Sequence, residues 1–281
     1  MQVISTIKEM QVFSKKMKAD GKSVGFVPTM GALHEGHISL IKNSVEQNEV
    51  TVVSIFVNPT QFGPTEDFNK YPKDHKGDTE KLIPLNVDAV FLPDVAEIYP
   101  KGFGTFVFVG GIGMILCGKS RPDHFNGVAT VVAKLFNTVM PDRAYFGQKD
   151  FQQTVVIRKM ARELALDVDI VVCPIMREAN GLAMSSRNAY LSDEERKAAL
   201  ILNQALEYGK GLMLSGRDEK PDLIKEKVKA FIAAEPLVEL EYVEIAGTEY
   251  LETLKELKTP AVLLVAAKVG TTRLIDNTTV E

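Results

Sequence analysis

The fold is decided by one stretch that passes from an apolar strand into a helix: Val24-Gly25-Phe26-Val27-Pro28-Thr29-Met30-Gly31-Ala32-Leu33-His34-Glu35-Gly36-His37. Apolar residues then recur at the spacing of a helix face, at Ile38, Ile41 and Val45. The N-terminus of a helix presents unpaired N–H groups and a partial positive charge, which suit a phosphate group. His34 and His37 lie three residues apart at this helix start, so both can donate to the same anion.

The two histidines have two other interpretations. One is an ordinary capped helix that happens to carry histidines. The other is a metal site, which the sequence disfavours because the spacing differs from the i, i+4 pair of zinc proteases. No further His or Cys clusters near this pair.

Five strand candidates alternate with helical segments over the first part of the chain: residues 24–27, 50–57, 87–92, 144–146 and 168–172. After Gly127, apolar residues spaced by three and four predict an amphipathic helix. The alternation predicts an α/β fold with a mainly parallel sheet covered by helices on both faces. Ligands bind such sheets beyond the carboxyl ends of the strands.

The pattern changes near residue 176 and predicts a second, smaller α+β domain. Ser192 and Glu195 have the spacing of a capping box, which we expect to open a long helix. That helix carries Leu202, Leu206 and Gly209. A loop is expected at residues 215–218, another helix at 221–233, and strands at 238–246 and 261–269. The expected domains are therefore residues 1–175 and 176–281.

Composition excludes several classes of protein. The 281 residues include 33 Lys or Arg and 37 Asp or Glu, and the resulting net charge of −4 argues against a general nucleic-acid or membrane-surface binder. The longest apolar run, at residues 261–267, is far shorter than the ~18 residues of a membrane span, and the N-terminus lacks the features of a signal peptide. Cys117 and Cys173 cannot make a disulfide framework and are typical of a reducing compartment. We expect a cytoplasmic protein.

Four further polar segments lie near predicted strand ends or helix starts: Phe146-Gly147-Gln148-Lys149-Asp150, Met184-Ser185-Ser186-Arg187, Asn58 with Gln61, and Arg121 with His124. Hydroxyl, ammonium and guanidinium groups hold polyphosphates, whereas neutral amides suit hydroxyl or carboxylate groups. Each segment alone is also consistent with a solvated turn or a helix cap. Together they predict a site for a phosphate-bearing ligand beside a small acid.

The chain resembles a known family through segments that occur in family order and at family-like spacing: residues 28–37, Phe56-Val57-Asn58-Pro59-Thr60-Gln61-Phe62, Tyr71-Pro72, Arg121-Pro122-Asp123-His124-Phe125-Asn126-Gly127-Val128, residues 146–150 and Met184-Ser185-Ser186-Arg187-Asn188. These are similar to the signature segments of the pantothenate synthetases, the pantoate–β-alanine ligases. Residues 270–277 also resemble that family's C-terminal end. The His-x-Gly-His of the first segment alone would indicate only the wider nucleotidylyltransferase superfamily.

The resemblance implies a Rossmann-like, doubly wound N-terminal domain, a smaller C-terminal domain that closes over the site, and a cytoplasmic homodimer. It implies that pantoate and ATP form pantoyl adenylate and pyrophosphate. β-Alanine then displaces AMP to give pantothenate. Mg²⁺ is expected with the triphosphate.

The resemblance also implies roles at single positions. The ATP-binding positions are Met30, Gly31, Ala32, Leu33, His34, Glu35, Gly36, His37, Gly147, Gln148, Lys149, Asp150, Met176, Met184, Ser185, Ser186 and Arg187. His37 matches the family's general acid, and the catalytic group is completed by His34, Lys149 and Arg187, which would stabilise charge on the phosphates. Gln61 and Gln153 would hold pantoate, and the further substrate-binding candidates are Asn58, Arg121 and His124. Asp78 lies where an acidic residue near the metal is expected.

Two other functions fit parts of the pattern. A nucleotidylyltransferase that acts on a small phosphorylated acceptor shares the phosphate segments, but it would require more cations near Gln61. A nucleotide-binding sensor without catalysis needs no second polar subsite such as that of Asn58 and Gln61. The sequence contains no convincing Ser/His/Asp or Cys/His nucleophilic pair, so catalysis by positioning and charge stabilisation is expected.

Overall fold

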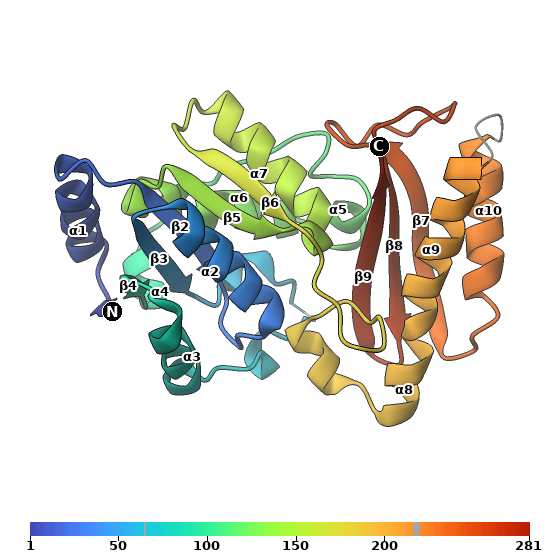
Figure 1. Ribbon diagram of the computed structural model, residues 1–281, viewed down its shortest axis with the longest axis horizontal. Helices are drawn as coiled ribbons and strands as arrows, with labels where there is room; N and C mark the ends of the chain where they lie inside the picture. Colours follow the sequence, from blue (N-terminus) through green and yellow to red (C-terminus); the bar gives the residue numbers. More distant parts are fainter. Residues whose placement is uncertain (65, 216–219) are drawn as a thin grey trace. The chain divides into compact units, whose positions relative to one another are not determined.

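The computed structural model describes residues 1–64, 66–215 and 220–281, which form two compact units (Figure 1). The first unit comprises Met1–Gly147 and Gln152–Pro174, and the second comprises Gln148–Phe151 and Ile175–Glu281. The chain passes from the first unit to the second between Pro174 and Ile175, one residue before the domain boundary expected after residue 175. Nothing in the sequence predicted that Gln148–Phe151 would group with the second unit while their chain neighbours on both sides belong to the first.

A six-stranded parallel sheet organises the first unit. Its strands are β1 (Gln2–Ile4), β2 (Val24–Thr29), β3 (Val50–Ile55), β4 (Ala89–Phe91), β5 (Arg143–Gly147) and β6 (Asp169–Cys173). In the order β1-β4-β3-β2-β5-β6, the chain moves outward from β2 in one direction and from β5 in the other. The order reverses between β2 and β5, which is where open parallel sheets bind ligands. The predicted α/β architecture is confirmed; β1, which is short and exposes most of its side chains, was not predicted.

Helices cover both faces of this sheet. Those up to residue 163 are α1 (Ile7–Ala19), α2 (Glu35–Gln47), α3 (His75–Leu82), α4 (Val95–Ile98), α5 (Cys117–Ser120), α6 (His124–Val139) and α7 (Phe151–Glu163), with short 3-10 turns at η1 (Pro59–Gln61), η2 (Phe68–Lys70) and η3 (Ile83–Leu85). Phe26 of β2 packs edge-on against Phe136 of α6, with 6.5 Å between ring centroids. Its neighbour Val27 lies in an apolar cluster with Ile41 of α2. Because successive side chains of a strand point to opposite faces, α6 and α2 cover opposite faces.

The second unit contains a three-stranded antiparallel sheet in the order β7-β8-β9. Its elements are β7 (Val238–Gly247), β8 (Ala261–Val269), β9 (Thr272–Val280), α8 (Asp193–Ala198), α9 (Leu200–Ser215), α10 (Pro221–Ile232) and the 3-10 turns η4 (Gln148–Asp150) and η5 (Ser186–Tyr190). Leu206 of α9, Val228 of α10 and Leu263 of β8 share one apolar core. The smaller α+β domain predicted from sequence is confirmed.

Three details of the second unit differ from expectation. The capping box is present, since Glu195 N donates to Ser192 Oγ at 3.2 Å, but the long helix is divided at Ala199 into α8 and α9. Alanine has the highest helix propensity, so the sequence does not mark the break. The strand β9 was not predicted because polar and apolar residues are mixed along it. Of the loop expected at residues 215–218, Ser215 ends α9 and residues 216–218 lie outside the described part of the chain.

Among the described helices, none is long and apolar enough to cross a bilayer. The two cysteines, Cys117 and Cys173, are both buried and both free. Burial raises the pKa of the Cys173 thiol, which keeps it in the neutral, weakly nucleophilic form.

A close contact between two backbones explains why position 127 is a glycine. The sequence analysis expected a helix to begin after this residue. The helix expected after Gly127 begins earlier, at His124, so that Gly127 lies within α6. A Cβ on Gly127 would lie 2.3 Å from the carbonyl oxygen of Thr60 and 2.7 Å from the nitrogen of Gln61. Gly127 therefore lets α6 pack directly on the backbone of η1.

We predict that Gly127→Ala lowers the free energy of unfolding by about 1–3 kcal/mol, because the added methyl overpacks two backbones that cannot move independently. Denaturant unfolding measures this change. The matched control is Gly211→Ala in α9, where a Cβ meets no atom within 4 Å. That substitution should leave stability unchanged or raise it by up to about 1 kcal/mol through helix propensity. Equal effects of the two substitutions would contradict the packing argument.

Candidate functional site

The corner between β2 and α2 is held in shape by side chains from other elements. Gly31 and Ala32 both have positive φ angles, 82° and 50°, and the left-handed region is unfavourable for alanine. The carboxylate of Asp78 in α3 accepts the backbone N–H groups of Ala32 and Leu33, each at 2.7 Å. Lys81, one turn further along α3, donates to the carbonyl oxygen of Leu33 at 2.8 Å. These contacts stabilise the strained corner, which faces the switch point of the sheet.

The two histidines of the corner support each other at the start of α2. His34 is the N-cap residue, and its Nδ1 accepts the N–H of Gly36 at 3.1 Å. The Nδ1 of His37 accepts the N–H of His34 at 3.4 Å, and the two ring centroids are 4.1 Å apart. A nitrogen that accepts a hydrogen bond carries no proton, so each ring is neutral and carries its proton on Nε2. Each ring therefore carries an Nε2–H donor.

The loop after β3 holds two buried amides, Asn58 and Gln61, in fixed orientations. The Nδ2 of Asn58 donates to Gln61 Oε1 at 3.0 Å and to the carbonyl oxygen of Gly127 at 3.1 Å. The hydroxyl of Tyr99 donates to Asn58 Oδ1 at 2.7 Å. Burial raises the pKa of Tyr99, although a hydrogen bond with Thr60 acts in the opposite direction, so the hydroxyl keeps its proton. This network fixes which atoms of the Gln61 amide are presented as donor and acceptor.

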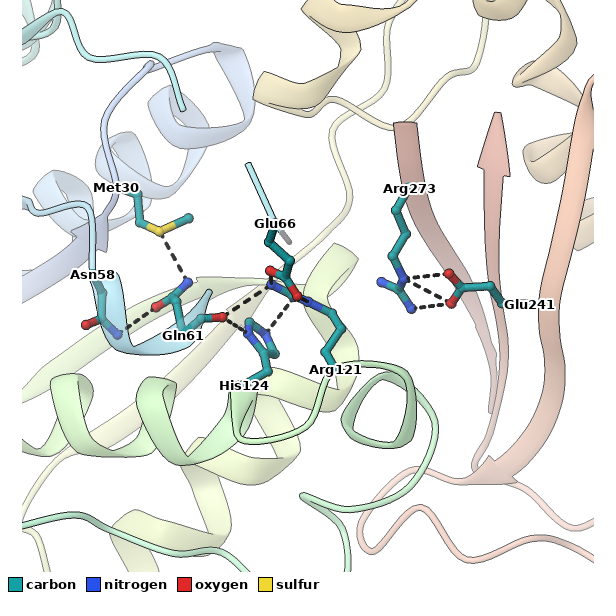
Figure 2. A network of polar contacts seen from close by, with 8 residues as sticks. All are labelled: Met30, Asn58, Gln61, Glu66, Arg121, His124, Glu241 and Arg273. Atoms are coloured by element: carbon teal, nitrogen blue, oxygen red, sulfur yellow. Dashed lines mark hydrogen bonds and ion pairs between the residues drawn. The ribbon is translucent and has the colours of Figure 1, made fainter. Parts of the chain in front are cut away.

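Gln61 also joins this loop to the β2–α2 corner. Its Nε2 donates to the Sδ of Met30 at 3.2 Å, and Figure 2 shows the two side chains pointing toward each other. The parallel register pairs Thr29 with Ile55, so the two loops leave the sheet at the same edge. The segment predicted to bind a nucleotide and the amide predicted to bind a small acid are thus in direct contact.

Arg121 and His124 form a chain of contacts that ends on the backbone of Gln61 (Figure 2). Arg121 pairs with Glu66 through two hydrogen bonds, Nε to Oε1 at 2.8 Å and Nη2 to Oε2 at 2.6 Å. Its Nη1 lies 3.0 Å from His124 Nε2, and His124 Nδ1 lies 2.8 Å from the carbonyl oxygen of Gln61. A guanidinium only donates and a carbonyl only accepts, so His124 is neutral with its proton on Nδ1. Both side chains thus contact protein groups that hold Gln61 in place.

Two adjacent glutamines of α7 have different environments. Gln152 is buried, donates to the carbonyl oxygens of Ile112 and Ile115, and accepts the N–H of Cys117 at 3.0 Å. Gln153, the predicted pantoate ligand, is partly exposed at the start of the same helix. Gly147 ends β5, and a Cβ there would meet no atom within 4 Å. The glycine therefore leaves space beside the carboxyl end of β5, at the switch point of the sheet.

In the second unit, the turn that carries Lys149 is attached to the C-terminal strand. The side-chain amide of Asn277 in β9 donates to the carbonyl oxygens of Gln148 and Lys149, at 2.9 and 3.0 Å. Gln148 Nε2 donates in return to Asn277 Oδ1 at 3.2 Å. The Lys149 ammonium lies 3.9 Å from the Asp150 carboxylate.

The segment from Met176 to Arg187 folds back on itself in the same unit. Met184 N donates to the carbonyl oxygen of Met176 at 2.9 Å, and Arg177 forms a bridge with Ala183. Ser185 caps the short helix η5, since its hydroxyl accepts the N–H of Arg187 at 3.2 Å. The segment thus presents Ser185, Ser186 and Arg187 on a defined turn.

The structure therefore groups the predicted residues in two sets. The first unit brings together residues 30–37, Asn58, Gln61, Asp78, Arg121 and His124, with Gly147 and Gln153 at β5 and α7. The second unit holds residues 148–150, Met176 and residues 184–187. Sequence reasoning missed Glu66, Tyr99 and Asn277. Their hydrogen-bond partners Arg121, Asn58 and Gln148 lie 55, 41 and 129 residues away, so no local pattern marks them. The likeness of residues 270–277 to a family segment was the one signal for Asn277.

No group of three or more His, Cys, Asp or Glu side chains in the described parts of the chain has the arrangement of a metal site. The pair His34 and His37 accepts backbone N–H groups through Nδ1, as described above, which explains the spacing of the two rings without a metal ligand role. The contacts are those of a helix cap, and the anion-binding role of this pair stays a prediction.

Comparisons with known proteins show the family to which the chain belongs. A family model described as pantoate-beta-alanine ligase matches residues 2–279. The pantothenate synthetase of Thermodesulfovibrio yellowstonii is 51% identical over 282 residues, covering 100% of both chains. That of Thermotoga neapolitana is 52% identical over 278 residues, covering 99% of both chains.

Solved structures show the same likeness. The pantothenate synthetase of Thermus thermophilus matches with a TM-score of 0.92 and 42% identity, covering 99% of each chain. The pantoate-beta-alanine ligase of Francisella tularensis, solved with β-γ ATP and β-alanine, matches with a TM-score of 0.80 and 34% identity over 99% of this chain and 97% of the other. With the family model spanning nearly its whole length, the chain belongs to the pantoate–β-alanine ligase family and is an ATP-dependent ligase of that class.

Proposed function

We propose that the chain makes pantothenate in two steps, through pantoyl adenylate, with the residues predicted from the sequence in the roles given there. The observation that carries the proposal is the contact between Gln61 and Met30, because it joins the amide subsite to the corner that holds the two neutral histidines. The Francisella tularensis relative, solved with β-γ ATP and β-alanine, supports ATP and β-alanine as ligands of this chain.

In the first step, a carboxylate oxygen of (R)-pantoate attacks the α-phosphorus of ATP, and the bond to pyrophosphate breaks. The Nε2–H groups of His34 and His37 donate to phosphate oxygens. His37 is assigned the general-acid role, for which its ring takes up a second proton on Nδ1, in place of the contact with the His34 N–H, before Nε2 gives its proton to the leaving pyrophosphate. Lys149 and Arg187 add positive charge where negative charge develops. Gln61 and Gln153 hold pantoate through neutral amides, which orient the carboxylate without pairing it with a cation and so preserve its nucleophilicity.

In the second step, the unprotonated amine of β-alanine attacks the carbonyl carbon of the adenylate, and AMP leaves with the electrons of the cleaved carbon–oxygen bond. The new amide nitrogen loses one proton, which the phosphate of the leaving AMP or solvent accepts. Gln61 lies beside this reaction as well. Exclusion of water protects the mixed anhydride, which hydrolyses readily when exposed.

For Arg121 and His124, the contacts support a positioning role on the pantoate side of the site. The charge of Arg121 is balanced by Glu66, and the buried ring of His124 donates to the Gln61 carbonyl. We propose that both residues act through Gln61, which they hold at a fixed distance from Met30. Asn58 acts in the same way from the other side.

The contacts of Asp78 do not fit a direct ligand of Mg²⁺. Its carboxylate is almost completely buried, with 1% of the side chain exposed, and each oxygen accepts a backbone N–H. Mg²⁺ in nucleotide sites keeps several waters and is bound largely by the phosphates themselves. We propose that the metal enters with ATP and that Asp78 maintains the corner at Ala32.

We also propose a cytoplasmic homodimer. Free cysteines at positions 117 and 173 fit a reducing compartment. Phe106 and Phe108 lie on a segment, residues 103–109, that joins neither sheet, and they are 58% and 64% exposed. Met114 nearby is 60% exposed. An extended segment with large exposed apolar side chains is typical of a surface that a second copy covers.

The first prediction concerns the adenylation step. His37→Ala or Lys149→Ala should lower the rate of pantoate-dependent ATP–pyrophosphate exchange at least a hundredfold, because loss of one donor to the transition state costs about 2.7–4 kcal/mol. Circular dichroism should show an unchanged fold. Near-normal exchange in both variants would contradict the assignment. Exchange that does not require pantoate would favour another nucleotidylyltransferase.

The second prediction separates the two roles considered for Asp78. Asp78→Asn should lower the free energy of unfolding by about 1–3 kcal/mol and raise KM for ATP, because one backbone N–H then faces an amide N–H₂ group. The magnesium concentration for half-maximal rate should not change. Asp74→Asn is the control, since Asn retains the cap on Gly77 at the start of the same helix. A large shift in the magnesium requirement at unchanged stability would show that Asp78 binds the metal.

The third prediction concerns assembly. Phe108→Ser should weaken self-association and shift the molecular mass measured by analytical ultracentrifugation toward that of the monomer, because it removes a large apolar contact. Leu164→Ser, which removes a side chain that is 51% exposed elsewhere, should leave the mass unchanged. A protein that is monomeric before any substitution would disprove the dimer.

A further inference from the structure

We propose that Asn277 is a positioning residue that fixes Lys149 in the arrangement needed for adenylation, and that Asp276 beside it fixes the Met176–Met184 segment. The proposal deepens the proposed function and rests on the assignment of Lys149 to the ATP site. Both residues lie on β9, near the end of the chain, and neither belongs to the residues predicted to touch a substrate.

The turn that carries Lys149 is too short to be stabilised by its own hydrogen bonds. The 3-10 turn η4 contains only Gln148–Asp150, and such short turns are stabilised mainly by outside contacts. Asn277 supplies them from a position 1% exposed, where water cannot replace a lost partner. Its two amide hydrogens are both used on main-chain carbonyls, of Gln148 and of Lys149 itself, and its oxygen accepts the Gln148 amide. The Asn277 amide therefore uses both its N–H groups to bind the backbone that carries Lys149.

Asp276 makes an equivalent attachment to the other nucleotide segment. Its carboxylate, 4% exposed, binds Arg177 through two hydrogen bonds, at 2.6 and 3.0 Å. Arg177 also donates to the carbonyl oxygen of Gly181 at 3.2 Å. It follows Met176, whose carbonyl accepts the N–H of Met184. The two-pronged geometry of a guanidinium–carboxylate pair fixes orientation as well as distance.

The two attachments belong to one strand. Adjacent side chains of a strand point to opposite sides, so Asp276 and Asn277 can each hold a different segment. Asn277 N also donates to Asp276 Oδ1 at 2.8 Å, which couples them directly. Lys149 and the turn of Ser185–Arg187 are thereby held by neighbouring residues of the same unit. Contacts with β9 therefore fix the positions of the Lys149 ammonium and of the Ser185 and Ser186 hydroxyls relative to each other. These are the groups predicted to bind the phosphates.

The test uses Asn277→Asp, which keeps the size of the side chain and its oxygen but places a second oxygen against the two carbonyls. We expect kcat/KM for ATP in the pantoate-dependent exchange reaction to fall at least tenfold, while KM for β-alanine in the full reaction is unchanged. Asn277→Ala, which removes the contacts without adding charge, should act in the same direction. The control is Thr279→Ala on the same strand, which should retain the activity of the unsubstituted enzyme.

A double-mutant cycle distinguishes positioning from general stability. If Asn277 acts through Lys149, then Asn277→Asp in a Lys149→Ala background should reduce exchange by less than threefold. A merely structural role would reduce it by the same factor in both backgrounds, and that result would overturn the proposal, as would unchanged kcat/KM in both Asn277 variants. If Lys149→Ala alone has no effect, the proposed ATP site fails instead, which separates the two failures.

Discussion

The structure depends on a few buried polar side chains that bind the backbone of its loops. Asp78 accepts two N–H groups of the β2–α2 corner, Asn58 donates to the backbone of α6, and Asn277 donates to the Lys149 turn. A buried backbone group without a partner costs about 1–3 kcal/mol, so each of these side chains restricts its loop to one arrangement. The loops that bear the candidate site residues are irregular, and these contacts give them their order.

Charge is distributed unevenly over the site residues. The histidines of the β2–α2 corner are neutral because each Nδ1 accepts a backbone N–H, so they contribute donors without net charge. The one cation beside Gln61 in Figure 2, Arg121, is balanced by Glu66. Under the proposed function, this pairing leaves the Arg121–Glu66 pair without net charge beside the amide assigned to pantoate. The cations assigned to the phosphates, Lys149 and Arg187, come instead from the second unit.

Much of the fold could be predicted from local patterns. The β-branched run at residues 50–57 and the apolar stripe after Gly127 identified a strand and a helix, since their side chains are buried in a regular period. Two predictions about the elements were wrong. The helix expected after Gly127 begins at His124, and the strand β9 was not predicted. In both cases residues serve a tertiary contact, Gly127 against Thr60 and Asn277 against Gln148, so the local pattern does not describe their environment.

The candidate site also combines residues that local patterns mark with residues that only tertiary contacts explain. Sequence motifs made His34, Gln61 and Lys149 candidates, because the chemistry of phosphate and carboxylate binding restricts which residue types can serve. They did not identify Glu66, Tyr99 or Asp276, whose side chains bind other protein groups and whose choice depends on what lies opposite them.

The sequence by itself determined the α/β class, the strand-to-helix corners and the kind of ligand they suit, because these follow from short-range periodicity and from side-chain chemistry. Only the tertiary structure decided the proton positions on His34, His37 and His124, the burial of Asp78 and the attachment of Lys149 to β9. Those features are set by hydrogen-bond partners distant in sequence, and such partners become neighbours only when the chain is folded.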